Sequence, residues 1–172
     1  MSLQEKMDSA VDNYLALSDI LRPDLEAMLA QDDETSHWRR NFIRASAALL
    51  EGYIFCWREI ASVGHEGSDP KLSGKENEAL DSEANMPADK RFKLTLRAAF
   101  KRLDLEPIPD FGGSEWERSR IVFSKRHMLM HPKRPSELEI SNEQWIELRE
   151  GIIWLFEQTF SFMSLLEAKY AG

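Results

Sequence analysis

The chain has 172 residues, of which 42% are hydrophobic and 30% are charged, and its formal net charge is −8. This composition is typical of a globular protein with its own core, and no apolar run reaches the length of a membrane span. The acidic balance argues against a protein that coats nucleic acid indiscriminately. Because Cys56 is the only cysteine, the chain forms no internal disulfide, and a zinc site built on thiolates is not expected.

The N-terminal residues lack the basic and then apolar layout of a signal peptide, so we expect a cytoplasmic protein that does not associate with membranes. Apolar residues recur at helical spacing through most of the chain. They predict a first helix over residues 3–21, a short continuation that starts at Pro23, and a long second helix from about residue 35 to 63. Gly, Ser, Pro and acidic residues break the pattern at 64–86, where we expect a flexible acidic insert.

Helical spacing resumes after this insert. Pro87 can open a third helix. Ser114 and Glu117 have the spacing of a capping box, so a fourth helix should begin at Ser114 and end near Met130, ahead of Pro132.

The last helix has its own start signal. Ser141 and Gln144 form a second potential capping box, and a long apolar stripe follows them. No alternating pattern of strand length competes with these helices, although residues 138–140 could form a short extended piece. The sequence therefore predicts an all-α fold, namely one domain over residues 1–172 arranged as an up-and-down bundle of four to five helices.

A strongly basic segment covers residues 118–136, which contain six Lys or Arg and no Asp or Glu. In a chain of net negative charge, this local excess predicts that an anion binds here and not over the whole surface. A second basic stretch at 90–102 either extends a nucleic-acid track or forms an ordinary solvated helix face.

Three residues in the first basic segment combine two kinds of chemistry. Arg126 offers a fixed cation that can hold a phosphoryl oxygen, and His127 and His131 are imidazoles of the kind that transfers protons near neutral pH. On a helix the two histidines share a face, whereas Arg126 points about 100° away. This combination predicts phosphodiester cleavage. The candidate catalytic residues are Arg126, His131 and His127, and the candidate RNA contacts are Arg120, Lys125, Lys133 and Arg134.

The pattern resembles the HEPN superfamily (higher eukaryotes and prokaryotes nucleotide-binding). Its signature is an arginine, four to six residues and then a histidine, usually with a polar residue directly after the arginine. Here Arg126 is followed by polar His127, three apolar residues and His131, between a capped helix and a long final helix. His127 departs from the family, in which asparagine is commonest at this position.

The resemblance implies a HEPN-like helical bundle with endoribonuclease activity that needs no metal ion or other cofactor. It also implies a homodimer with two motifs facing across its interface, and a role in a toxin, defence or RNA-processing system. A toxin would have a cognate antitoxin or a neighbouring protein as a partner. In the implied mechanism, His131 acts as acid or base, Arg126 stabilises charge on the phosphate, and His127 transfers a second proton or only donates a hydrogen bond.

Three alternatives remain open. His127 and His131 have a spacing that can place two imidazoles on one metal ion, although no acidic residue or cysteine lies near them in sequence. They could instead cap the end of the fourth helix, with Arg126 in a salt bridge. A HEPN-like fold without catalysis would leave a nucleotide-binding, RNA-binding or dimerisation module.

Overall fold

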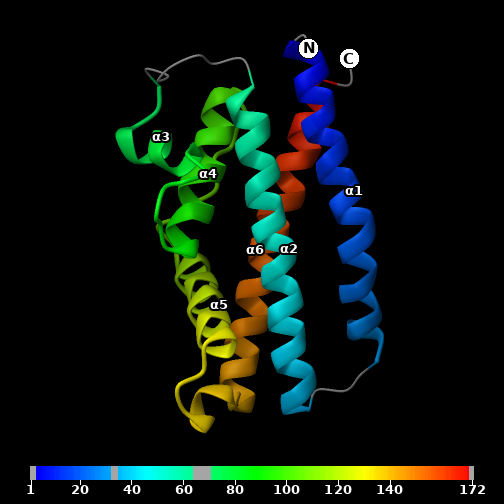
Figure 1. Cartoon of the computed structure of the whole chain (residues 1–172), viewed down its shortest axis with the longest axis vertical. Helices are drawn as coiled ribbons and strands as arrows, with labels where there is room; N and C mark the ends of the chain where they lie inside the picture. Colours follow the sequence, from blue (N-terminus) through cyan, green and yellow to red (C-terminus); the bar gives the residue numbers. More distant parts are fainter. Residues whose placement is uncertain (1–2, 32–34, 64–70, 171–172) are drawn as a thin grey trace. The chain divides into compact units, whose positions relative to one another are not determined.

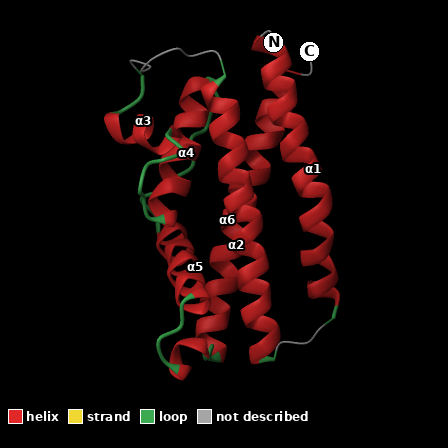
Figure 2. Ribbon diagram, viewed as in Figure 1, coloured by secondary structure: helices red, strands yellow, loops and turns green. Residues whose placement is uncertain are grey.

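The computed structural model describes residues 3–31, 35–63 and 71–170, and these ranges contain six α-helices, one short 3-10 helix and no strand (Figures 1 and 2). The prediction of an all-α fold is confirmed. The helices are α1 (Leu3–Ala30), α2 (Ser36–Ser62), α3 (Gly74–Leu80), α4 (Ala88–Arg102), α5 (Ser114–Met130), η1 (Pro135–Leu138) and α6 (Asn142–Tyr170). None of the helices in the described ranges is both long enough and apolar enough to cross a membrane.

The chain divides into two compact units. Unit 1 comprises residues 1–16, 51–111 and 158–172, and unit 2 comprises residues 17–50 and 112–157. The helices α1, α2 and α6 therefore contribute residues to both units, whereas α3 and α4 belong to unit 1 and α5 belongs to unit 2.

Aromatic side chains form the core of unit 1. Trp57 of α2 is fully buried and meets Phe92 of α4 and Phe162 of α6 edge-on, with ring centroids 5.4 and 5.7 Å apart. Tyr53, one turn earlier on α2, stacks on Tyr14 of α1 at 4.6 Å. Large rings of this kind bury much apolar surface, so they hold the parts of α1, α2, α4 and α6 that belong to this unit together.

Helix α3 lies within the segment predicted to be a flexible insert, and that prediction is wrong for residues 74–80. Residues 64–70 of the predicted insert lie outside the described residues. The side chains of Ser73 and Glu76 form a capping box, and the buried Glu76 carboxylate accepts hydrogen bonds at 2.8 Å from Lys101 of α4. The acidic residues of this segment favoured a loop in the sequence. In the structure, however, the Glu76 carboxylate is the group that binds α3 to α4.

A second aromatic cluster forms the core of unit 2. Trp38 stacks on Phe42 within α2 at 5.1 Å, and Trp145 of α6 meets both rings edge-on. The Trp38 indole N–H also donates to the carbonyl of Met28 in α1 at 3.0 Å. This cluster positions α6, against which α5 packs.

Several predicted helix boundaries can be compared with the structure. The Ser141–Gln144 capping box is confirmed by reciprocal hydrogen bonds at 3.2 Å. Helix α5 begins at Ser114 as predicted, but its N-cap is Gly113 and no side chain caps it, so the Ser114 capping box is wrong. Pro23 lies inside α1 and does not begin a separate helix.

Candidate functional site

The C-terminal end of α5 carries both candidate histidines. His131 is the C-cap of the helix, and its backbone N–H donates to the carbonyl of His127 at 3.0 Å. Both side chains are exposed. Their ring centroids are 5.3 Å apart and their planes are tilted by 54°. The structure thus places the two imidazoles beside each other at an accessible helix end.

These histidines continue a polar stripe along the exposed side of α5. Arg120, Ser124, His127 and His131 follow one another at intervals of four, three and four residues, and all four are exposed. This spacing places them on one face of the helix. Arg120 pairs with Glu117 at 3.0 Å on the surface, where such a contact contributes little to stability. The stripe therefore offers a guanidinium, a hydroxyl and two imidazoles to solvent.

Arg126 lies on another side of α5. Its side chain is half-buried, and the helical spacing places it on the side that carries the buried residues Val122, Phe123 and Leu129. On an α-helix its position is rotated by about 100° from that of His127. To share a phosphate with the imidazoles, the guanidinium must reach around the end of the helix.

Two arginines of α2 hold the end of α5 and the loop that follows it. Arg44 donates to the Leu129 carbonyl at 2.9 Å, and Arg40 donates to the Leu138 carbonyl at 3.2 Å. The last carbonyls of a helix have no partner within the helix, so the Arg44 guanidinium satisfies one of them and favours the negative end of the helix dipole.

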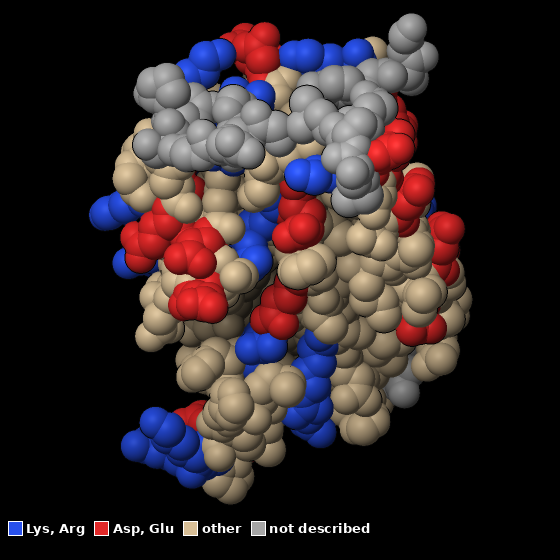
Figure 3. Space-filling view, turned by 45° about the horizontal axis from the view of Figure 1, so that its top comes forward, with Lys and Arg blue, Asp and Glu red and all other residues tan. Residues whose placement is uncertain are grey.

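Sequence reasoning missed this contribution of α2. A signal was present, because residues 36–50 contain Arg39, Arg40 and Arg44 and no acidic residue. In the space-filling view, Lys and Arg side chains gather at the lower end, where acidic side chains are few (Figure 3). Helix α2 thus adds basic side chains within unit 2 to those of the segment around α5.

Lys125 does not fit its predicted role as an RNA contact. The residue is 8% exposed, and its ammonium group donates to the carbonyls of Glu137 and Glu139 at 3.0 and 2.6 Å. Burial lowers its pKa, and the nearby charges of Glu137 and Glu139 partly oppose that shift. Through these two hydrogen bonds, Lys125 holds the segment that follows α5 against the helix. Lys133 and Arg134 are exposed in that segment and, with Arg120, remain the candidate RNA contacts.

The second basic stretch belongs to unit 1 and serves its local structure. Arg97 and Lys101 bind the Glu76 carboxylate, and Arg102 donates to the Ala61 carbonyl at 2.6 Å. Lys93 donates to the Phe111 carbonyl at 3.3 Å. These contacts favour the interpretation of the stretch as an ordinary helix face.

The donor set around the histidines bears on the metal alternative. Among the residues that the structure describes, no cluster of three or more His, Cys, Asp or Glu side chains could hold a metal ion. The two imidazoles of α5 would therefore supply only two protein ligands, whereas zinc sites usually have three or four.

Comparisons with protein-family models, with curated proteins and with solved structures give no significant match to the chain.

Proposed function

We propose that the chain is an endoribonuclease of the HEPN type, with a HEPN-like bundle, that cuts RNA without a metal ion through a 2′,3′-cyclic phosphate. The observation that supports this function is the pair of exposed imidazoles on α5, whose ring centroids are 5.3 Å apart, in a strongly basic part of the chain. A cytoplasmic toxin, defence or RNA-processing role, with a cognate antitoxin or neighbouring protein as partner, belongs to the same proposal.

The chemistry requires one base and one acid. A neutral imidazole removes the proton from the RNA 2′-OH, and the resulting oxygen attacks the adjacent phosphorus. The bond to the 5′-oxygen breaks, and a protonated imidazole gives that oxygen its proton. The products are a 2′,3′-cyclic phosphate and a free 5′-OH.

The proposal allows two sources for the second imidazole. His127 and His131 of one chain are close enough to face a single phosphate group from the same side of α5. Alternatively, a homodimer supplies His131 twice, with the ends of two α5 helices meeting at a twofold axis. His131→Ala abolishes activity in both cases, whereas His127→Asn abolishes it only if His127 transfers a proton.

Cations complete the proposed site. Arg126 stabilises the charge that builds on the phosphoryl oxygens, and Arg120, Lys133 and Arg134 contact the RNA backbone. Arg44 acts as a positioning residue, because its bond to the Leu129 carbonyl holds the last turn of α5 beside His131.

One observation favours the alternative of a non-catalytic nucleotide-binding, RNA-binding or dimerisation module. Arg126 is half-buried on a side of α5 different from the stripe of histidines. If the guanidinium serves only to anchor α5, the same basic surface would bind RNA without cutting it.

The test compares matched variants on single-stranded RNA in EDTA. His131→Ala and Arg126→Ala should each remove most of the activity while the helical circular dichroism signal is retained. His37→Ala is the control, because His37 is also an exposed histidine of unit 2, in contact with Asn41 at 2.9 Å. Full activity in His131→Ala would refute the mechanism, and RNA binding without cleavage by the wild type would favour the alternative.

A further inference from the structure

A cavity in unit 1 has no role in the proposed cleavage reaction. It has a volume of about 210 Å³ and lies between α2 and the start of α4. This volume is many times what one water molecule needs. The cavity is lined by Glu51, Ile54, Phe55, Arg58, Met86, Ala88 and Arg91, so all of its lining belongs to unit 1.

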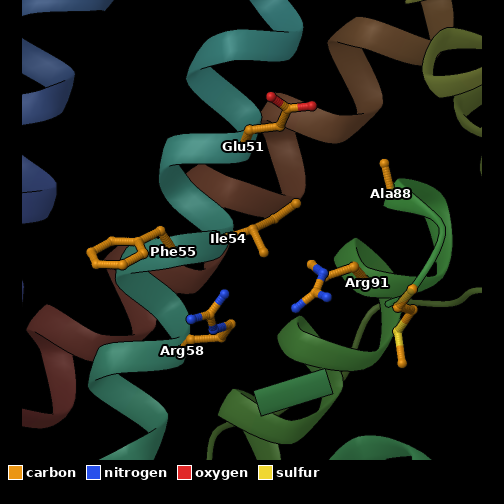
Figure 4. A pocket seen from close by; sticks show the side chains of 7 residues that line it. Glu51, Ile54, Phe55, Arg58, Ala88 and Arg91 are labelled. Atoms are coloured by element: carbon orange, nitrogen blue, oxygen red, sulfur yellow. The ribbon is translucent and has the colours of Figure 1, made fainter. Parts of the chain in front are cut away.

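Two guanidinium groups approach the cavity from different helices. Figure 4 shows Arg58 of α2 and Arg91 of α4 extending toward one another. Among the described lining residues only Glu51 is acidic. It lies two helical turns before Arg58, which is about 10 Å along the axis of α2. The lining therefore carries two positive charges and one negative charge.

Arg58 has an unused hydrogen-bond donor. Its guanidinium carbon lies 5.7 Å from the centroid of the Phe55 ring. Its Nε–H is buried and has no acceptor among the residues that the structure describes. A buried donor without a partner is costly, so this N–H is available to an acceptor that enters the cavity.

Arg91 is already oriented by the backbone. Its guanidinium donates to the carbonyls of Asp81 and Ala84, in the segment between α3 and α4. Carbonyl oxygens satisfy N–H donors but do not neutralise a full positive charge. These bonds hold the guanidinium in one place and leave its positive charge available to a ligand. Because the side chain is already ordered, the entropy cost of binding is lower.

The start of α4 adds a weaker positive field. Ala88, the first residue of this 15-residue helix, lines the cavity, and the N-cap Pro87 provides no side-chain hydrogen bond to the first turn. The N-terminal end of a helix favours anions, and guanidinium groups bind phosphate through two parallel hydrogen bonds.

We propose that this cavity binds a phosphate group, either as free phosphate or as the phosphoryl group of a small monoester. Arg58 and Arg91 hold the phosphoryl oxygens from two sides. Ile54, Phe55 and Met86 provide apolar surface for the remainder of a monoester. Because the lining lies in unit 1 and the histidines lie in unit 2, this site does not depend on the proposed cleavage activity.

Isothermal titration calorimetry at low ionic strength tests the proposal with inorganic phosphate, adenosine 5′-monophosphate and adenosine as probes. We expect saturable binding of phosphate or of the monophosphate with one site per chain, and no binding of adenosine. Binding of phosphate by itself would identify the free ion as sufficient, and binding of the monophosphate without phosphate would identify a monoester. Arg58→Gln should weaken binding at least tenfold.

Two further variants keep the test decisive. Lys90→Gln removes the same charge from an exposed position next to Arg91, outside the cavity lining, and should leave the affinity within twofold. Arg58→Lys keeps the charge but loses the fork of donors, so it should still weaken binding, and it provides a readout if Arg58→Gln does not fold. Equal weakening by Lys90→Gln and Arg58→Gln, or no saturable binding of either phosphate probe, would overturn the proposal.

Discussion

Gly151 of α6 gives a sharp test of how α5 is held, because two effects of a substitution to alanine oppose each other there. Alanine is favoured over glycine in a helix by about 0.8–1 kcal/mol. A Cβ at this position would, however, lie 2.9 Å from the Arg118 carbonyl oxygen and 3.0 Å from both the Arg118 carbonyl carbon and Val122 Cγ2. Overpacking of a core costs about 1–3 kcal/mol.

The steric effect should prevail at Gly151. Two of the three close atoms belong to the backbone of α5, which cannot rotate away as a side chain can. The two helices must therefore separate. This separation would break the hydrogen bond that the Ser119 hydroxyl donates to the Gly151 carbonyl at 3.2 Å. Because the backbone cannot yield, we take the upper part of the overpacking range, about 2–3 kcal/mol, and subtract about 1 kcal/mol for helix propensity. We therefore expect Gly151→Ala to lower the free energy of unfolding by about 1–2 kcal/mol.

The control is Gly74→Ala at the start of α3. No atom lies within 4 Å of a Cβ built there, so alanine should be neutral or stabilising by up to about 1 kcal/mol. Urea denaturation followed by circular dichroism measures both variants. The tryptophan fluorescence should change as well, because Trp116 of α5 and Trp154 of α6 are two of the five tryptophans of the chain and their rings are 6.0 Å apart. A Gly151→Ala variant as stable as the wild type would refute this description of the contact.

Other predictions concern charged residues that are buried in the two units. Glu76→Gln should lower the free energy of unfolding by about 2–4 kcal/mol, because Lys101 and Arg97 lose their carboxylate. Burial raises the pKa of Glu76, but hydrogen bonds from Lys101 and Ser73 outweigh it, so the net pKa is lowered. The carboxylate therefore stabilises the fold above its ordinary pKa, and this contribution is lost as the pH falls through the lowered value. In urea denaturation the wild type should lose more stability on acidification than Glu76→Gln, and parallel pH profiles would contradict this. Lys125→Met should cost about 1–3 kcal/mol, and hydrogen exchange of the amides at 135–140 should accelerate. Unchanged exchange there would mean that Lys125 does not hold this segment.

The helical architecture could be predicted because it depends on local spacing. The stripe that includes Trp38, Phe42 and Tyr53 has the period of a helix, and these residues are buried in the structure. Helix α3 could not be predicted from such spacing, since it is seven residues long and one of its two buried side chains is the charged Glu76. Its start signal, Ser73 followed three residues later by Glu76, was present in the sequence.

Some features of the candidate site could likewise be predicted from local spacing, and others could not. The contact between His127 and His131 follows from their spacing on one helix, and so does the different direction of Arg126. The role of Arg44 depends on a residue 85 positions away, and the burial of Lys125 depends on the path of the chain after α5. Contacts of this kind arise from tertiary packing, which local spacing does not encode.

The most direct test of the proposed function is the chemical nature of the RNA ends produced by the wild-type protein in EDTA. The proposed mechanism predicts 2′,3′-cyclic phosphate and 5′-OH ends, formed by the wild type and by His37→Ala but not by His131→Ala. Cleavage that stops in EDTA and returns with zinc or manganese, or intact RNA in the presence of bound wild-type protein, would contradict it.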